Sequence, residues 1–125
     1  MKKNSLNDSE YEIIPFALSD CSTNIDEMAC RTLDELFCSS KDAFGVLKAD
    51  IEGMGLNFVH GAEQIIRRDR PLLSLSIYHN ANEFTGIYQT LKSWDLNYHI
   101  EIKSFSPLSN WGEYSLFAYP KEWIS

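Results

Sequence analysis

Apolar residues in this chain fall into segments whose spacing alternates between that of strands and that of helices. A nearly continuous apolar run at residues 72 to 78 predicts a parallel strand that is buried on both faces. A similar stretch at residues 43 to 49 predicts a second strand. Between them, apolar positions at helical spacing predict a helix over residues 54 to 68, and these positions are Leu56, Val59, Ala62 and Ile66.

Two capping-box patterns mark the starts of further helices. Asn80-x-x-Glu83 precedes an apolar face and predicts a helix over residues 82 to 94. Thr32-x-x-Glu35 has the same spacing and predicts a short helix directly after it. The apolar face expected on the longer helix consists of Phe84, Ile87, Tyr88, Leu91 and Trp94.

Three more segments have the pattern of strands. Residues 11 to 18 are apolar around Pro15, which predicts a short or edge strand because proline donates no ladder hydrogen bond. Alternation at residues 98 to 102 and a β run at 114 to 119 predict a closing antiparallel pair. The resulting order of strands and helices predicts a layered α/β domain with a largely parallel sheet and helices packed on it.

Length and composition add the domain organisation. The chain has 125 residues, of which 44% are hydrophobic and 23% charged, as in a single globular domain. Residues 1 to 10 are polar, so we expect a flexible tail there and one α/β domain over residues 11 to 125.

The charge balance bears on possible partners and location. The chain carries 18 acidic and 11 basic side chains and a net charge of -7, which argues against binding to nucleic acid or an anionic membrane. The basic cluster at residues 67 to 70 stands where a helix is expected to end, and cations are favoured there. The sequence contains no apolar stretch of membrane-spanning length and no signal-peptide core, so the default expectation is a cytoplasmic protein.

Polar residues follow both predicted parallel strands, and these residues are the candidates for chemistry. Asp50 and Glu52 follow one strand, whereas Tyr78 and His79 end the other. Ligand crevices in open sheets lie at the carboxyl ends of strands, so neighbouring strands would bring all four side chains together. Asp50 or His79 could then accept a proton from a substrate hydroxyl. The alternative is that Asp50 only caps a helix and His79 only caps a strand.

Two other kinds of site receive less support from the residues. The same carboxylates and imidazole could bind a divalent cation, but their spacing matches no metal motif, and we expect no metal. The three cysteines also lack the close pairs of a zinc knuckle or a redox dithiol. Gly53 and Gly55 open a helix as in a dinucleotide-binding turn, but Phe58 replaces the third glycine, which favours a simple tight turn.

Several short motifs follow one another along the chain. The central motifs are Leu47-Lys48-Ala49-Asp50-Ile51-Glu52-Gly53, Gly61-Ala62, Arg70-Pro71 and Ile77-Tyr78-His79. The flanking ones are Ala17-Leu18-Ser19-Asp20, Thr32-Leu33-Asp34-Glu35-Leu36 and Leu116-Phe117-Ala118-Tyr119-Pro120. In order and spacing, over about residues 11 to 121, these motifs resemble the FkbM-type methyltransferases.

The resemblance implies an enzyme that transfers a methyl group from S-adenosylmethionine to an oxygen, often of a sugar or natural product. It implies a partial Rossmann-like class I methyltransferase sheet, mostly parallel with an antiparallel terminal strand. Asp50 and Glu52 match the family's D-x-E-G positions and, with His79, are the catalytic candidates, while Asp20 and Asp50 are the cofactor-binding candidates. Methyl transfer is an in-line displacement, so the enzyme mainly aligns a small-molecule or saccharide acceptor and assists loss of its proton.

Two departures from the family pattern change these expectations. The family commonly has a second glutamate two residues after the motif glycine, and Gly55 stands there in this chain. The family's first two strands, with the glycine-rich cofactor loop, have no counterpart in these 125 residues. We therefore expect a chain that is inactive on its own, with an exposed sheet edge near residues 43 to 49 for a second copy or a partner chain. The alternative function is a non-catalytic remnant that serves as a dimerisation or interaction module.

Overall fold

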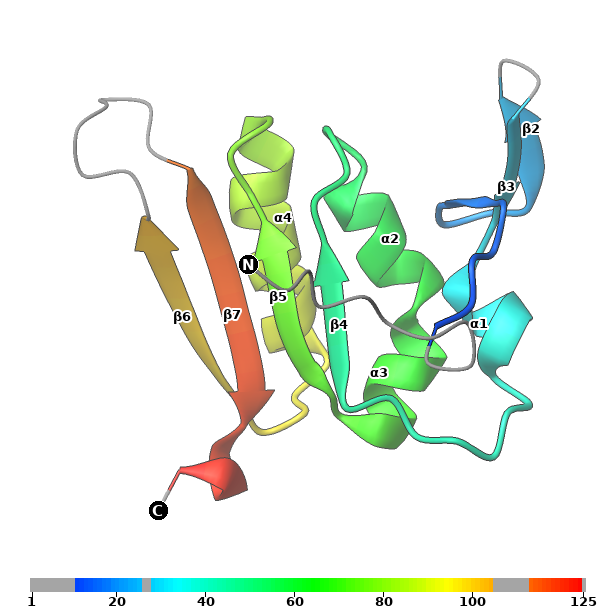
Figure 1. Cartoon of the computed structure of the whole chain (residues 1–125). Coiled ribbons are helices and arrows are strands. Elements are labelled where there is room, and N and C mark those ends of the chain that lie inside the picture. The colour runs from blue at the N-terminus through cyan, green and yellow to red at the C-terminus, as the bar shows by residue number, and fades with distance from the viewer. Residues whose placement is uncertain (1–10, 26–27, 105–112, 125) are drawn as a thin grey trace, which may run out of the picture.

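The computed structural model describes residues 11–25, 28–104 and 113–124, so the tail predicted for residues 1–10 lies outside the described residues. The described strands form two sheets (Figure 1). The smaller sheet has the order β1-β3-β2, with β1 at Ala17–Leu18, β2 at Thr23–Ile25 and β3 at Met28–Arg31. The larger has the order β4-β5-β7-β6, with β4 at Val46–Ala49, β5 at Leu72–Ser76, β6 at Tyr98–Ser104 and β7 at Tyr114–Pro120. The helices are α1 (Leu33–Phe37), α2 (Gly55–Gly61), α3 (Glu63–Asp69), α4 (Ala81–Ser93) and the 3-10 turn η1 (Lys121–Trp123).

The larger sheet is mixed. β4 and β5 are parallel neighbours, as the sequence predicts, and Ala49 is paired with Leu75 near their carboxyl ends. β7 runs antiparallel to both β5 and β6, which confirms the closing antiparallel pair and inserts the last strand between them. β6 therefore points the same way as β4 and β5 (Figure 1). The sequence predicts a largely parallel sheet, and three of its four strands do point the same way. Among the paired strands of this sheet, however, only β4 and β5 are parallel.

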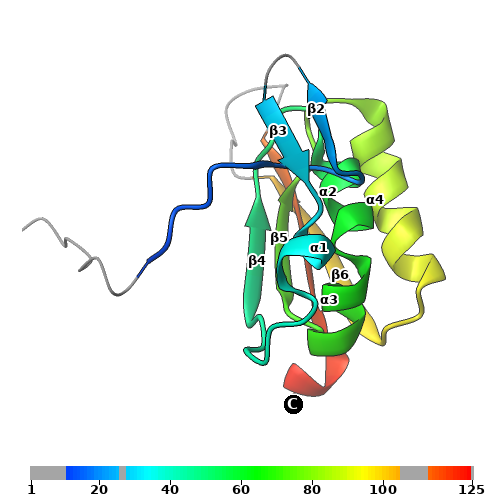
Figure 2. The ribbon, with the colours of Figure 1, turned by 90° about the vertical axis from the view of Figure 1, so that its right-hand side faces the viewer.

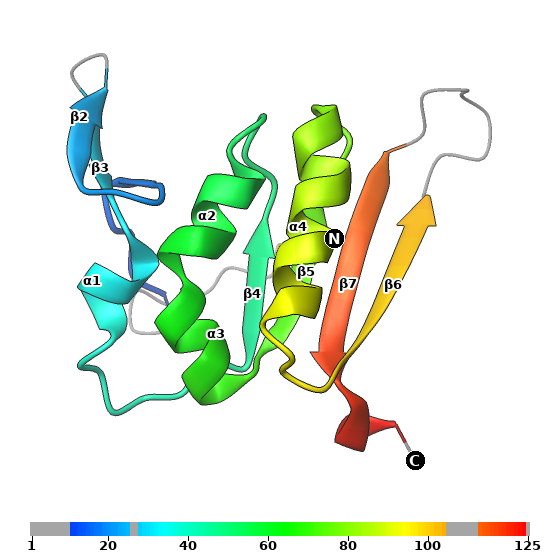
Figure 3. The same ribbon diagram turned by 180° about the vertical axis from the view of Figure 1, so that it is seen from behind.

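Helices α2, α3 and α4 cover one face of the larger sheet (Figures 2 and 3). The hydrophobic core lies between these helices and the sheet, and Leu73 and Leu75 of β5 are part of it. On the opposite face of β5, Ser74 and Ser76 are only partly buried. The prediction that residues 72 to 78 are buried on both faces is therefore wrong, because the described helices cover a single face.

β4 forms one edge of this sheet, since its strand partner among the described residues is β5. Leu47 and Ala49 face the core, whereas Lys48 is exposed and Val46 retains 61% of its accessible surface. An exposed edge near residues 43 to 49 agrees with the sequence-based expectation.

The single helix predicted over residues 54 to 68 is wrong, because it is broken into α2 and α3. The Gly61 backbone packs so closely on the chain after β1 that a Cβ there would collide with the carbonyl oxygen of Ser19. Directly after the break, the buried Asp34 carboxylate accepts hydrogen bonds from the backbone N–H groups of Gln64 and Ile65, each at 2.9 Å. This contact from α1 caps α3 as a separate helix.

The start of α4 agrees with the capping prediction, but its buried face differs. Asn80 Oδ1 accepts a hydrogen bond from the Glu83 backbone N–H at 2.9 Å. Phe84 and Tyr88, which were expected in the core, remain 43% and 40% exposed. The buried residues of the helix are Glu83, Ile87 and Leu91.

The first part of the chain is only partly as predicted. The strand expected over residues 11 to 18 is reduced to β1, which does lie at a sheet edge. The predicted cap of α1 is present, because Thr32 Oγ1 accepts a hydrogen bond from the Glu35 N–H at 2.9 Å. The sequence did not predict β2 and β3, since their short segments lack apolar alternation.

Candidate functional site

Asp50 and His79 come together at the carboxyl ends of β4 and β5. Asp50 directly follows β4, and His79 follows β5 in the segment that leads into α4. Because the two strands are parallel neighbours, their ends deliver both side chains to the same corner. The distance between Asp50 Oδ1 and His79 Nε2 is 3.8 Å. The structure thus joins the two side chains that the sequence placed at these strand ends.

A tight turn follows Asp50 and carries Glu52. The Met54 N–H donates a hydrogen bond to the Ile51 carbonyl at 2.7 Å, and Gly53 has a φ of +80°. This backbone conformation favours glycine, so the tight-turn interpretation of the glycine pair is correct. Glu52 lies exposed in this turn, and its charge acts on Tyr78.

Tyr78 adds a protonated phenol to the corner. Its ring stacks on the imidazole of His79, with the ring centroids 4.2 Å apart. Reduced contact with water raises the pKa of Tyr78, and the negative charges of Asp50, Glu113 and Glu52 raise this pKa further. The phenol therefore stays neutral and can donate a hydrogen bond, for which Asp50 is an acceptor in the structure.

A buried carboxylate lies behind His79. Glu83 is only 1% exposed, and its Oε2 lies 3.4 Å from His79 Nδ1. Its other oxygen, Oε1, accepts a hydrogen bond from the Gly55 backbone N–H at 2.7 Å. Among the described residues, neither His79 Nδ1 nor Glu83 Oε2 has a hydrogen-bond partner of good geometry. The imidazole thus stands between an exposed carboxylate at Asp50 and a buried one at Glu83.

Asp20, the remaining candidate, lies elsewhere, against the helix α2. Its carboxylate interacts with the side chains of Asn57 and Ser19, and these hydrogen bonds lower the pKa of Asp20. Asp50 and His79 are not among its interaction partners in the described part of the chain. The structure therefore does not join Asp20 to the corner through a direct contact.

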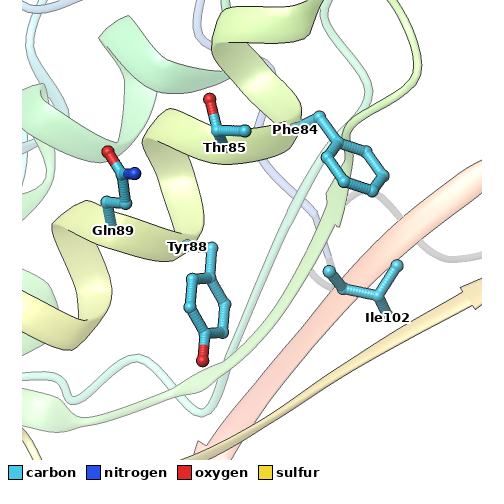
Figure 4. Close-up of a pocket in the computed structure, with 5 residues that line it drawn as sticks. All are labelled: Phe84, Thr85, Tyr88, Gln89 and Ile102. Carbon is cyan, nitrogen blue, oxygen red and sulfur yellow. The ribbon is translucent and has the colours of Figure 1, made fainter.

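An apolar groove of about 200 Å³ lies between α4 and β6 (Figure 4). Phe84, five residues after His79, forms one end of the groove and makes an edge-to-face contact with Tyr114, with ring centroids 6.2 Å apart. None of the described lining residues is charged. The lining residues are Phe84, Thr85, Tyr88, Gln89 and Ile102.

The described residues contain neither a cluster of metal ligands nor a membrane-spanning helix. Within residues 11–25, 28–104 and 113–124, no three His, Cys, Asp or Glu side chains are grouped as metal ligands. None of the helices described in these ranges is long and apolar enough to cross a membrane.

Comparison with known proteins identifies the class as a methyltransferase domain. A family model for the methyltransferase FkbM domain matches residues 4–100. The chain therefore belongs to the FkbM methyltransferase family, as the sequence motifs indicate. Methyl transfer is accordingly the general activity of its family.

A solved structure shows the same fold. The crystal structure of methyltransferase FkbM from Methylobacillus flagellatus KT matches with a TM-score of 0.72 and 23% sequence identity, over 83% of this chain. The match covers 27% of that protein, so the chain spans well under half of its length. A search among curated proteins found no match.

Sequence reasoning missed Glu83 as a member of the site. It identified the residue only as the second half of a capping box, yet the carboxylate does not return to the start of its own helix. The available signal was the spacing of four residues between His79 and Glu83 across the start of a helix. The contact with Gly55 spans 28 residues and has no local signature.

Proposed function

We propose that this chain supplies the acceptor side of an S-adenosylmethionine-dependent methyltransferase site, with O-methyl transfer to a sugar or natural-product hydroxyl. The observation that carries the proposal is the convergence of Asp50 and His79 at the ends of parallel neighbouring strands. A Rossmann-like class I sheet, completed by strands beyond the edge of β4, is part of the same proposal.

The residues of the corner suit a cationic methyl donor. When bound, S-adenosylmethionine supplies an electrophilic methyl group on a positively charged sulfur. The Asp50 side chain is 53% exposed and lies at an open strand end, where a carboxylate favours a cation. Glu52 adds a second negative charge next to it. Gly53 keeps the turn free of a side chain.

His79 is the group that takes the proton from the acceptor hydroxyl. Its Nε2 faces the open side of the corner near Asp50, at 3.8 Å, whereas its Nδ1 faces the buried side. On methylation, the acceptor hydroxyl would lose its proton to Nε2, and the nearby Asp50 carboxylate would stabilise the resulting imidazolium. Asp50 and His79 also align the hydroxyl, which contributes to rate through orientation.

The surroundings favour an acceptor without negative charge. Asp50, Glu52 and Glu113 all act electrostatically on Tyr78, so an anionic group would be repelled from this corner. The groove between α4 and β6 offers the aromatic rings of Phe84 and Tyr88, with Thr85 and Gln89 for hydrogen bonds (Figure 4). A neutral hydroxylated ring fits this combination of stacking surfaces and neutral polar groups.

We further propose that this chain forms the donor site only in part. It spans 27% of the structurally similar FkbM methyltransferase. Among the described residues, the turn at the corner connects β4 to α2. It contains Gly53, and α2 begins at Gly55. A glycine-rich turn upstream, with Asp20 or another acidic group beside the cofactor, would complete the pocket.

Calorimetric titration with S-adenosylmethionine tests both parts of the proposal. We expect weak but detectable binding by this chain, with a dissociation constant of about 1 mM, and undetectable binding by Asp50→Asn. S-adenosylhomocysteine, whose sulfur is neutral, should bind less tightly than the methyl donor. Micromolar binding by the wild-type chain would contradict the partial donor site, and equal binding by the Asp50→Asn variant would contradict the role of Asp50.

A further inference from the structure

Glu83 is a buried carboxylate that contacts two other elements of the fold. It comes from α4, binds the first residue of α2 through its Oε1, and faces His79 through its Oε2. We propose that Glu83 is a positioning residue that fixes the proton of His79 on Nδ1 and leaves Nε2 free to accept a proton. The catalytic meaning of this role rests on the proposed function, but the proton position on the ring does not.

The hydrogen-bonding capacity of Glu83 defines the arrangement. An ionised carboxylate only accepts hydrogen bonds, and its Oε1 is already occupied by the Gly55 N–H at 2.7 Å. The remaining oxygen faces His79 Nδ1 at 3.4 Å, a little beyond the usual length of a direct hydrogen bond. A buried carboxylate oxygen without a hydrogen bond destabilises the fold. A proton on Nδ1, which can donate a hydrogen bond to Oε2, is therefore favoured.

The other ring nitrogen is thereby prepared for chemistry. A neutral imidazole with its proton on Nδ1 has a lone pair on Nε2. That nitrogen faces Asp50 at 3.8 Å, on the exposed side of the corner. The stack with Tyr78 holds the ring from one side. Glu83 thus acts through His79 and does not itself contact the open side of the corner, since it is 1% exposed.

The identity of residue 55 is consistent with this role. A Cβ on this residue would lie 2.7 Å from Glu83 Oε1 and 3.4 Å from the Ile87 side chain. The space next to Gly55 is therefore filled by the Glu83 carboxylate from α4, and only a residue without a side chain leaves room for it.

A purely structural role is the competing explanation. Glu83 could simply fasten α4 to the start of α2 through the Gly55 hydrogen bond. The two explanations differ in what they predict for the histidine ring. Only the positioning role makes the tautomer of His79 depend on the chemical nature of residue 83.

The test is the ring-nitrogen NMR spectrum of the intact chain labelled with 15N-histidine, compared with that of Glu83→Gln. We expect the wild-type His79 to carry its proton on Nδ1. In the variant, the glutamine oxygen keeps the Gly55 bond, so its NH2 group faces His79 and donates to Nδ1. The ratio of the Nδ1–H to the Nε2–H tautomer should therefore fall by about tenfold.

The spectrum contains its own controls. His60 and His99, which contact Thr90 and Glu101, should not change, and His79→Gln assigns the remaining signal. An Nε2–H tautomer in the wild-type chain, or an equal tautomer ratio in the Glu83→Gln variant, would overturn the proposal. If the variant does not fold, the tautomer of His79 in the wild-type spectrum alone tests the proposal. No ligand is used, so failure here is separate from failure of S-adenosylmethionine binding.

Discussion

At the scale of single residues, the corner depends on close contacts that leave little room for change. The carboxylate of Glu83 reaches a backbone amide on another helix, and this contact exists because Gly55 has no side chain. A similar contact lies at the opposite end of β4, where the Asp69 carboxylate accepts a hydrogen bond from the Phe44 N–H at 2.9 Å. Each of these contacts leads to a prediction that a single substitution can test.

Gly55→Ala should destabilise the chain by about 1–3 kcal/mol, because the new methyl group would lie 2.7 Å from Glu83 Oε1 and displace a buried, hydrogen-bonded carboxylate. Gly45→Ala is the matched control, since nothing lies within 4 Å of a Cβ at that residue. Urea denaturation measures both variants. Equal stability of the two would contradict the tight contact between α2 and α4.

Asp69→Asn should change how stability depends on pH. The side chain of Arg68 and the backbone amide of Phe44 lower the pKa of Asp69. A lowered folded pKa means that the stabilisation is present above about pH 4 and is lost as the pH falls through the folded value. The variant should be about 1–2 kcal/mol less stable than wild type at pH 7, with the difference closing in acid. A difference that does not vary with pH would argue against this ion pair.

Not all site residues could be predicted from the sequence. Asp50 and His79 were found because each follows an apolar strand, and the ends of strands are visible in the pattern. Glu83 was not, because its hydrogen bond with Gly55 forms only after α2 and α4 have packed. Local patterns describe which elements form, whereas a buried polar contact between elements depends on their packing.

At the scale of elements, the chain divides one expected helix into two. Apolar positions at helical spacing run through residues 54 to 68 without interruption, so periodicity alone predicts continuity. The break is imposed by contacts from the first part of the chain, namely the close approach of Ser19 to Gly61 and the Asp34 cap of α3. Tertiary contacts outweigh helical propensity here, and the sequence pattern contains no sign of them.

Asp34→Ala should cost about 1–3 kcal/mol, because it leaves two backbone N–H groups at the start of α3 without their acceptor. Asp42→Ala, at an exposed position in the loop before β4, is the control and should change stability by less than about 0.5 kcal/mol. Thermal unfolding followed by circular dichroism compares them. A small effect at Asp34 would mean that α3 does not depend on this cap.

At the scale of the whole molecule, the larger sheet is covered by described helices on one face only and is open at β4 (Figure 2). The α/β class and the parallel pairing of β4 with β5 follow from the sequence pattern, but the uncovered face does not. Residues 72 to 78 are apolar enough for burial on both faces, whereas only alternate residues of β5 are fully buried in this chain. The pattern in β5 is typical of a sheet that is covered on both faces.

An open edge strand favours association, so the wild-type chain should self-associate with rising concentration in sedimentation experiments. Val46→Glu should shift it toward the monomer, because Val46 is 61% exposed on β4. Ile124→Glu alters an apolar residue of comparable exposure, 49%, at the other end of the chain and should have no effect. A wild-type chain that stays monomeric at millimolar concentration would contradict association through β4.

The central claim is that the corner formed by Asp50 and His79 is the methyl-transfer site of this FkbM-family chain. Amide NMR spectra recorded during titration with millimolar S-adenosylmethionine test it most directly, because they locate even weak binding. The account predicts shifts at residues 50 to 53 and 78 to 80, which disappear in Asp50→Asn. Shifts confined to other parts of the chain, or no shifts at all, would contradict it.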